Sequence, residues 1–302
     1  MKVLISVLNY NNFLATKNCI SSIIKNIRED YELLIVDNNS SDNSFKLIKE
    51  QFKNHISIKA DYNGGYAYGH RIAARYALKN KFNLIWILNN DLTVRKETLH
   101  ELLSSFKKHG LGLYGSITLK SENPDIINFG GGDTSDLSKP LDYNSYEGLS
   151  LDLYKKIKDF RKVQSIEGSS FIIPLEIIKK YGFMREEYFM YGEETDYCYE
   201  LGKKEVFSYL VPSSVVVHKG AESLKNKKYL EKYYRRRNFI LFQKTHYNLN
   251  TLKYLSKEIG LFNILYFFIK SYIFSLDKDD LYYYNLANLH AIINKYGKLN
   301  DS

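Results

Sequence analysis

The chain of 302 residues is 44% hydrophobic, 25% charged and 15% aromatic. This composition excludes a mainly disordered protein, and the length suffices for one large domain or two smaller ones. Its two cysteines, Cys19 and Cys198, are too few for a disulfide framework or a four-cysteine zinc site. The sequence has no run of about 18 apolar residues, so we expect no membrane-spanning helix and a protein of the cytoplasm.

The formal net charge is +9, and most of it lies in one segment. Residues 219–247 contain nine basic residues and two acidic ones. A concentrated basic segment is typical of proteins that bind the phosphates of a nucleotide, an anionic lipid surface or a nucleic acid. The general abundance of Lys, Asn, Ile and Tyr offers a compositional explanation for the total charge, but it explains the clustering less well.

The first 120 residues alternate between strand-like and helix-like segments. Apolar runs predict buried strands at 2–8, 31–37, 56–60, 83–89 and 111–117, and helical spacing occurs at 14–27 and 72–78. The alternation predicts an α/β fold with a mostly parallel sheet that helices cover on both faces. Ligands of such sheets bind at the carboxyl ends of the strands.

The pattern changes after residue 120. Residues 120–163 lose their periodicity and contain two prolines and a glycine triplet, which predicts a long loop or insertion. Patterning returns at 163–174, with helices near 175–181 and 193–203 and a strand at 206–218 that we expect to break at Pro212. From about residue 225 the pattern is helical, and 261–276 is the most apolar part. We therefore predict an α/β domain over residues 1–247 and a helical C-terminal extension over 248–302.

Four polar clusters follow the predicted strands of the first half. They are Asn9–Asn12, Asp37–Asp42, Asn63–Gly69 and Asn89–Asp91. On a parallel sheet these clusters converge at one edge. The sequence lacks a G-x-G-x-x-G motif after the first strand and a G-x-x-x-x-G-K-[ST] motif, which argues against a dinucleotide-binding dehydrogenase and a phosphate-cradling NTPase loop.

In their order, these clusters resemble those of the family 2 glycosyltransferases, and most of all the rhamnosyltransferase-like enzymes of bacterial surface-polysaccharide synthesis. The matching pieces are Tyr10-Asn11, DNNSSD (37–42), NGGYAYG (63–69), LNND (88–91), the run at 189–201, His218 and YYRRRN (233–238). Each piece is weak alone, but the ordered set over residues 2 to 247 is specific. The resemblance implies a Rossmann-like GT-A fold and an inverting transfer of a sugar from a nucleoside diphosphate to a saccharide hydroxyl, in surface-polysaccharide or lipopolysaccharide synthesis.

The resemblance also implies which residues contact the nucleotide. They are Tyr10, Asn11, Asp37, Asn39, Asn63, Gly65, Arg71, Asn89, Asn90 and Arg237. Asp37 would accept hydrogen bonds from the base or ribose; its alternative role is a helix cap, for which residues 40–42 are better placed. Arg71 stands where the family usually has Asn, so we expect it to pair with a phosphate or to face solvent. Arg237 is expected to bind the diphosphate through two N–H groups.

A divalent cation, Mn²⁺ or Mg²⁺, is the implied cofactor, with Asp91 and His218 as its ligands. A carboxylate after the fourth strand suits a hard cation, Asn89 can add an amide oxygen or a water bridge, and an imidazole favours Mn²⁺. The family motif has two acids here, whereas Asn89-Asn90-Asp91 has one. The alternative for His218 is a histidine that ends a strand and bonds to the backbone.

Glu193, Glu194 and Asp196 open a predicted helix after an aromatic loop. Acids at this position interact favourably with the helix dipole, but the proposed reaction also needs a base that removes the proton of the attacking hydroxyl. The family pattern Glu-Asp-x-Asp assigns that base to Glu194 and supporting roles to Glu193 and Asp196. On a helix, residue 194 lies about a quarter-turn from the face of 193, 196 and 200, so the acids cannot all point at one atom. Glu200 stands where the family commonly has a basic residue.

The expected partners are a nucleoside-diphosphate sugar and a saccharide acceptor, with a lipid-linked acceptor as a hypothesis, and we expect no nucleic acid. Arg235 and Arg236 are expected to face solvent or lipid headgroups. The segment 261–276 is either an interfacial helix at the inner face of the cytoplasmic membrane or the core of a C-terminal bundle. Two alternatives are a nucleotidyltransferase, which the missing basic Gly-rich loop disfavours, and a non-enzymatic binder of anionic glycan or nucleic acid through 219–247.

Overall fold

The computed structural model describes residues 1–132, 146–157, 160–219, 228–260 and 280–299, together with the single residues 141, 144, 262 and 266. The apolar segment 261–276, whose role as interfacial or core helix was left open, therefore lies outside the described residues except for Phe262 and Tyr266. No helix within the described ranges is both long and apolar enough to cross a membrane.

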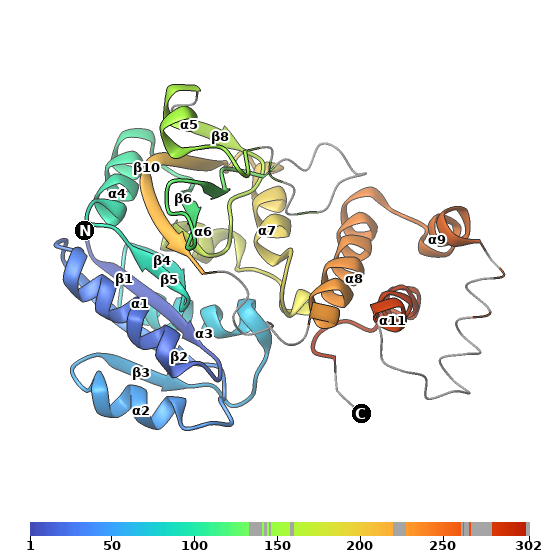
Figure 1. Cartoon of the computed structure of the whole chain (residues 1–302), viewed down its shortest axis with the longest axis horizontal. Helices are drawn as coiled ribbons and strands as arrows, with labels where there is room; N and C mark the ends of the chain where they lie inside the picture. Colours follow the sequence, from blue (N-terminus) through green and yellow to red (C-terminus); the bar gives the residue numbers. More distant parts are fainter. Residues whose placement is uncertain are drawn as a thin grey trace.

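One mixed sheet forms the centre of the N-terminal part, and ten of its strands lie in the described residues (Figure 1). The strands are β1 (Val3–Asn9), β2 (Tyr31–Asp37), β3 (Ile56–Lys59), β4 (Leu84–Asn89), β5 (Leu92–Val94), β6 (Leu113–Lys120), β7 (Ile127–Phe129), β8 (Arg161–Val163), β9 (Ser170–Pro174) and β10 (Ser208–His218). Their order across the sheet is β3-β2-β1-β4-β9-β6-β10-β5, with β7 on β6 and β8 on β10.

Most of the longer strands run in the same direction. β1 is parallel to β2 and β4, β2 is parallel to β3, and β6 is parallel to β10. β9 is antiparallel to both β4 and β6, so these two also share a direction. The predicted mostly parallel sheet is confirmed, and it places the ends of β1, β2 and β4 at one edge.

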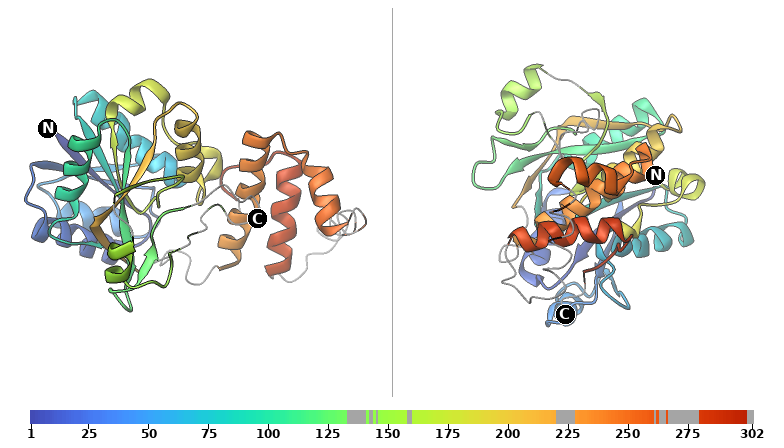
Figure 2. Two further views of the ribbon diagram at one scale, coloured as in Figure 1. Left: turned by 90° about the horizontal axis from the view of Figure 1, so that it is seen from above. Right: turned by 90° about the vertical axis from the view of Figure 1, so that its right-hand side faces the viewer.

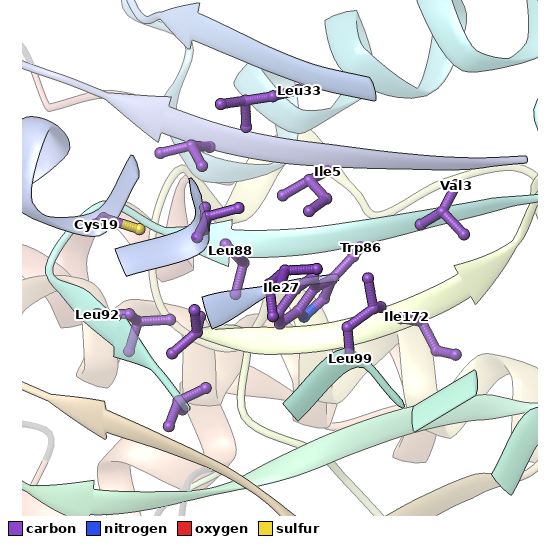
Figure 3. Close-up of a cluster of buried hydrophobic side chains, with 14 of the residues drawn as sticks. Val3, Ile5, Cys19, Ile27, Leu33, Trp86, Leu88, Leu92, Leu99 and Ile172 are labelled. Atoms are coloured by element: carbon purple, nitrogen blue, oxygen red, sulfur yellow. The ribbon is translucent and has the colours of Figure 1, made fainter. Parts of the chain in front are cut away.

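Helices cover both faces of this sheet, as predicted. The helical segments are α1 (Phe13–Asn26), α2 (Ser44–Gln51), α3 (Gly65–Lys79), α4 (Thr98–His109), α5 (Leu151–Ile157), α6 (Leu175–Tyr181), the 3₁₀ turn η1 (Glu186–Tyr188), α7 (Glu193–Gly202), α8 (Lys228–Tyr247), α9 (Thr251–Ile259) and α11 (Asp280–Ile292). Odd-numbered residues of β1 pack with α1, α2 and α4 around Trp86 (Figure 3), and Leu4 packs on the other face with α3, α6 and α7. This alternation is the consequence of the two-residue period of a strand.

The described C-terminal helices form a separate layer beside the sheet (Figure 2). α8 packs against α11 through Tyr233, Tyr234, Tyr283 and Ala287, and against α9 through Ile240 and Leu255. The aromatic residues Phe189 and Tyr191, which precede α7, join the first of these clusters. The division at 247/248 stays a prediction; α8, which precedes it, packs on both the α9–α11 layer and the segment before α7.

Two sequence expectations need correction. The strand expected to break at Pro212 is continuous from Ser208 to His218, with a register shift against β6 between Val211 and Val215. Such a bulge accommodates a residue that cannot donate a ladder hydrogen bond. The expected irregular segment at 120–163 contains, in its described part, the short elements β7, α5 and β8, which were too short to produce a periodic pattern.

The start of α3 imposes a tight steric constraint. Gly65 has φ +86°, and an added Cβ would lie 2.0 Å from the carbonyl oxygen of Phe189. Gly110 has a similar φ of +81° but has open space around its Cα. We expect Gly110→Ala to lower the free energy of unfolding by about 1–3 kcal/mol through backbone strain alone. Gly65→Ala should cost roughly 2 kcal/mol more because its methyl group meets backbone. Urea unfolding of both variants measures the difference, and equal losses would contradict the close contact.

Candidate active site

The loops after β1 and β2 are joined by a buried polar network. Asn9 Nδ2 donates to Asp37 Oδ2 over 2.7 Å, and the backbone N–H and hydroxyl of Ser40 donate to the two oxygens of the same carboxylate over 2.8 and 2.7 Å. Asp37 is fully buried. Asn90 Nδ2 extends the network through Thr16, whose hydroxyl donates to Asn9 Oδ1. The structure thus shows Asp37 joining two loops, and its contact with a nucleotide stays a prediction.

Around this network, the predicted nucleotide-binding residues form the rim of the sheet edge. Asn11 and Asn39 have positive φ values of 47° and 58°, a conformation that Asn tolerates better than most residues. Asn11 Oδ1 accepts from the backbone N–H of Ser41 over 2.8 Å, and Asn63 Oδ1 accepts from that of Gly65 over 3.1 Å. Local hydrogen bonds therefore hold these loops in shape. The ring of Tyr10, 37% exposed, lies on the same rim.

Asp91 and His218 lie next to each other, 127 positions apart in sequence. The antiparallel pairing of β5 with β10 sets Leu92 opposite His218, and the N–H of Lys219 donates to the carbonyl of Asp91. Asp91 Oδ1 lies 3.2 Å from His218 Nε2. Both atoms are buried, and neither makes a hydrogen bond with correct geometry to another described residue.

This pair fits a divalent cation. Two ligands bound at about 2.1 Å and at right angles to each other are about 3 Å apart, which is close to the observed separation. The orphaned oxygen and nitrogen are also ligand types suited to Mn²⁺. Within the described ranges, no group of three or more His, Cys, Asp or Glu residues could hold a metal ion. Of the described residues, this pair would supply two ligands to such a cation.

Glu167, which the sequence analysis did not select, completes the surroundings of His218. Its Oε1 lies 3.1 Å from His218 Nδ1, and its Oε2 accepts a 2.6 Å hydrogen bond from the hydroxyl of Thr118. Burial by itself lowers the pKa of His218, but the adjacent carboxylates of Asp91 and Glu167 outweigh it and raise the pKa to about 10. The position of Glu167 as the only charged residue within 163–174 was the available signal for this site.

The same contacts act on Glu167 itself. Burial raises the pKa of Glu167, but its bonds to His218 and Thr118 outweigh this effect and hold the pKa below its usual value. An ionised carboxylate only accepts hydrogen bonds, so Glu167 receives the Nδ1–H of His218 and directs Nε2 at Asp91. The raised pKa keeps a proton on Nε2, and a cation held by Asp91 and His218 would displace that proton.

The acids at the start of α7 occupy different environments, as the helical geometry predicted. Asp196 is buried and accepts from the hydroxyl of Tyr188 over 3.0 Å; its Oδ1 lies 2.7 Å from His246 Nε2, and its Oδ2 lies 3.2 Å from Arg185 Nε. These contacts tie α7 to α8 and to the preceding loop. Burial, followed by repulsion from Glu194, raises the pKa of Glu193 well above its ordinary value of 4.5. A protonated Glu193 leaves Glu194 as the better candidate for a base.

Glu194 lies near the segment that carries Glu167. A Cβ added at Gly168 would be 3.1 Å from Tyr66 Oη and 3.4 Å from Glu194 Cδ, so Tyr66 and Glu194 flank that glycine. The hydroxyl of Tyr66 donates to the carbonyl of Gly168. Burial raises the pKa of Tyr66, and repulsion from Glu194, Glu193 and Glu167 adds to this rise. The structure therefore gathers the α7 acids and the Asp91–His218 pair on two sides of residues 167–168.

Two arginines predicted to bind phosphate are engaged elsewhere. Arg71 is partly exposed, with 32% of its side-chain surface accessible: its Nε lies 3.0 Å from Glu186 Oε1, and it donates to the carbonyl of Met184 over 2.7 Å. Arg237 is 1% exposed and donates to the backbone carbonyls of Glu187, Tyr188 and Gly297 over 3.2, 2.8 and 2.6 Å. Protein oxygens thus engage Arg237 and, in part, Arg71, and the contact of either residue with a phosphate stays a prediction.

The arginines that precede Arg237 also have partners in the protein. Arg235 pairs with Glu231 and lies 4.4 Å from the ring centroid of Tyr191. Arg236 donates to Asn288 Oδ1 over 2.7 Å and pairs with Glu258. The side chain of Arg235 is 36% exposed, so for this residue the expectation that it faces solvent or lipid headgroups stays a prediction, whereas the side chain of Arg236 is 11% exposed and mostly faces protein. Glu200, the position of reversed charge, pairs with Lys203 and Arg185.

Comparison with known proteins agrees with this architecture. The model of the family "Glycosyl transferase family 2" matches residues 4–172. The "Low-salt glycan biosynthesis hexosyltransferase Agl10" of Haloferax volcanii is 26% identical over 206 residues, which are 67% of this chain and 62% of that protein. The chain thus spans less than two thirds of the length of this curated relative.

Two solved structures share the fold. One is the mannosyltransferase PcManGT of Pyrobaculum calidifontis in complex with GDP-Man and Mn²⁺, with a TM-score of 0.60 at 12% identity. The match covers 97% of this chain and 86% of the mannosyltransferase chain. The other is GalNAc-T7 with UDP, GalNAc and Mn²⁺, with a TM-score of 0.58 at 17% identity. This match covers 90% of this chain and 58% of the GalNAc-T7 chain. The family model spans more than half of the chain and includes the ends of β1, β2 and β4. The chain therefore belongs to glycosyl transferase family 2 and has the GT-A fold.

Proposed function

We propose that this glycosyltransferase moves a sugar from a nucleoside diphosphate to a hydroxyl of a saccharide acceptor, with inversion at the anomeric carbon. The observation that carries the proposal is the buried pair of Asp91 Oδ1 and His218 Nε2, which lie 3.2 Å apart at the edge of the sheet without a well-formed hydrogen bond. Acids suited to proton transfer lie on the other side of residues 167–168. The solved relatives that contain UDP or GDP-Man together with Mn²⁺ support this arrangement.

Asp91 and His218 would hold a divalent cation, which when bound neutralises the charge that develops on the departing nucleoside diphosphate. Glu167 keeps His218 in the tautomer that presents Nε2. Tyr10, Asn11, Asn39, Asn63 and the backbone at Gly65 form the proposed contact surface for the nucleotide. Asp37 and Asn90, through the buried network, and Asn89 at the end of β4 are proposed to hold that surface in place. Neither Arg71 nor Arg237 is included, since both are bound to protein oxygens.

Glu194 is the proposed general base. As the acceptor oxygen forms its bond to the anomeric carbon, its proton passes to the Glu194 carboxylate while the bond to the nucleoside diphosphate breaks. A single displacement of this kind inverts the anomeric centre. Glu193, held protonated by burial and by the neighbouring charge, does not compete for the proton.

The acceptor and its cellular setting remain part of the proposal. Synthesis of a surface polysaccharide or lipopolysaccharide on a lipid carrier, at the inner face of the cytoplasmic membrane, follows from the sequence resemblance. The related Agl10 is named for glycan biosynthesis and hexosyl transfer, which supports a hexose donor and a glycan product. A binder of anionic polymers through 219–247 is less well supported, because Arg235, Arg236 and Arg237 all have partners within the protein.

The first test is turnover of UDP-, dTDP- and GDP-sugars with Mn²⁺ or Mg²⁺ and then with chelator, in the presence of a lipid-linked saccharide. We expect one nucleoside diphosphate to be released only with metal. Asp91→Ala and His218→Ala should each lower this release at least about 100-fold, because the developing diphosphate charge is no longer neutralised. Asp152→Ala, an exposed acid on α5, is the matched control and should leave it unchanged. Full activity in chelator would contradict the metal role.

Glu167→Gln tests the support of His218. A neutral amide does not fix the imidazole tautomer as a carboxylate does, so Mn²⁺ affinity should fall about 10- to 100-fold. Titration followed by the electron paramagnetic resonance signal of free Mn²⁺ measures this affinity without turnover. Glu147→Gln, at an exposed residue that pairs with Lys120, should bind Mn²⁺ like the unaltered protein. Equal affinities in the two variants would remove Glu167 from the metal site.

Glu194→Gln and Glu193→Gln separate the base from its neighbour. Glu194→Gln should lower kcat at least about 100-fold with donor binding unchanged, since the hydroxyl has no proton acceptor. Glu193→Gln imitates the protonated acid and should retain transfer. It should also stabilise the fold increasingly as pH rises above 4.5, because the wild-type unfolded state loses the Glu193 proton there while the folded state keeps it. Loss of transfer in Glu193→Gln alone would reverse the assignment.

A further inference from the structure

The loop that leads into α7, residues 187–192, has an unusual backbone. Phe189 and Tyr191 have φ values of 63° and 68°, and Gly192 has φ 96°. Positive φ is unfavourable for large side chains and persists only where surrounding contacts enforce it. This loop ends at Glu193, so its conformation determines where α7 begins and where Glu193 and Glu194 stand.

Asn238 on α8 provides much of this enforcement. It is fully buried, and its Nδ2 donates to the carbonyls of Tyr188, Met190 and Tyr191 over 2.9, 2.7 and 2.7 Å. The two N–H groups of this amide serve the carbonyls of Met190 and Tyr191 and are shared with that of Tyr188, which also accepts from the backbone N–H of Met190 and from Arg237.

Arg237 acts on the same loop in two ways. It donates directly to the carbonyls of Glu187 and Tyr188. Its Nε and one terminal nitrogen also donate to Asn238 Oδ1 over 3.0 and 2.9 Å. Because the amide oxygen of Asn238 is held by Arg237, its nitrogen must face the loop. A further bond, from Arg237 to the carbonyl of Gly297, anchors the guanidinium to the C-terminal segment.

Contacts on the remaining sides complete the hold. The backbone N–H of Tyr66 in α3 donates to the carbonyl of Phe189 over 2.8 Å. The rings of Phe189 and Tyr234 stack with centroids 5.2 Å apart, and Arg235 lies over the ring of Tyr191. The loop is therefore gripped between α3 and α8, and neither helix carries the proposed base.

We propose that Arg237 and Asn238 are positioning residues that hold loop 187–192 in its strained conformation and so place Glu194 for catalysis. The role of Glu194 in this statement rests on the proposed function. The hold on the loop does not, because it follows from the hydrogen bonds alone. On this view the C-terminal helices form part of the catalytic apparatus without touching the substrate.

The experiment compares Asn238→Leu with Arg236→Leu. Leucine at 238 keeps the volume of the side chain but removes its bonds to the loop. Arg236 lies on the same helix and bonds instead to Asn288 and Glu258. We expect Asn238→Leu to lower kcat about 10- to 100-fold with the donor KM changed less than about twofold, since misplacement of a base by about 1 Å has this effect. Arg236→Leu should lower the melting temperature without lowering kcat. If Asn238→Leu does not fold, Asn238→Ser, which leaves room for a water, replaces it.

Hydrogen exchange of the amides at 188–192 gives a readout that needs no turnover. These amides should exchange at least about tenfold faster in the Asn238 variant than in Arg236→Leu. Equal exchange in the two variants overturns the proposal. A raised donor KM with unchanged kcat also overturns it and would support the earlier prediction that Arg237 binds the diphosphate. If the unaltered protein transfers no sugar, the proposed function fails, while the exchange result still decides whether the loop is held.

Discussion

The antiparallel contact between β5 and β10 is the interaction on which the site depends. β5 is a short strand of Leu92–Val94 that follows Asp91 directly, and β10 ends at His218. Their pairing brings a carboxylate from the first third of the chain to an imidazole near residue 220. Neither strand forms such a contact alone, because β10 must first be fixed in the sheet beside β6. The position of His218 is thus a consequence of sheet assembly, and the side chains of Glu167 and Thr118 then fix its ring.

The site is built from two groups of residues that the sheet keeps apart. On one side, the ends of β1, β2 and β4 are joined by the buried carboxylate of Asp37, and they carry the asparagine-rich rim. On the other side, α7 presents two adjacent glutamates whose charges repel each other, so one of them stays protonated. Between α7 and the candidate metal pair lie residues 167–168, where Glu167 contacts His218 and Gly168 lies beside Glu194. Burial and the charge of its neighbour together raise the pKa of Glu193 well above its ordinary value.

The basic segment illustrates why charge counted along a sequence does not locate a ligand. Arg235, Arg236 and Arg237 are consecutive on α8, so they point in three directions about 100° apart. One reaches Glu231 and an aromatic ring, the next reaches Glu258 and Asn288, and the last reaches backbone carbonyls before α7. Guanidinium groups suit this purpose, since each offers five donors in a planar arrangement. Arg236 thus joins α8 to α9 and α11, and Arg235 and Arg237 join α8 to the segment before α7.

Much of the fold could be predicted from the sequence, since its causes are local. The apolar runs of β1, β2 and β4 and the polar residues after each strand were visible as patterns, and the parallel sheet follows from their alternation with helices. The candidate metal pair and the α7 acids came from the order of motifs. Glu167 could not be selected as a site residue, because no nearby residue in the sequence indicates a role for it. Its partner, His218, is 51 positions away.

The sequence by itself determined the class of fold, the family and the residue types available at the sheet edge. Only the tertiary structure decided which of those residues are free to act. Arg237, Asp37 and Asp196 have the chemistry of ligand-binding groups, yet burial and protein partners engage all three. The physical reason is that a polar group removed from water must be satisfied, and the nearest partner in space is set by packing between distant segments. Asp91 and His218 differ because packing leaves an oxygen and a nitrogen facing each other without a proper hydrogen bond.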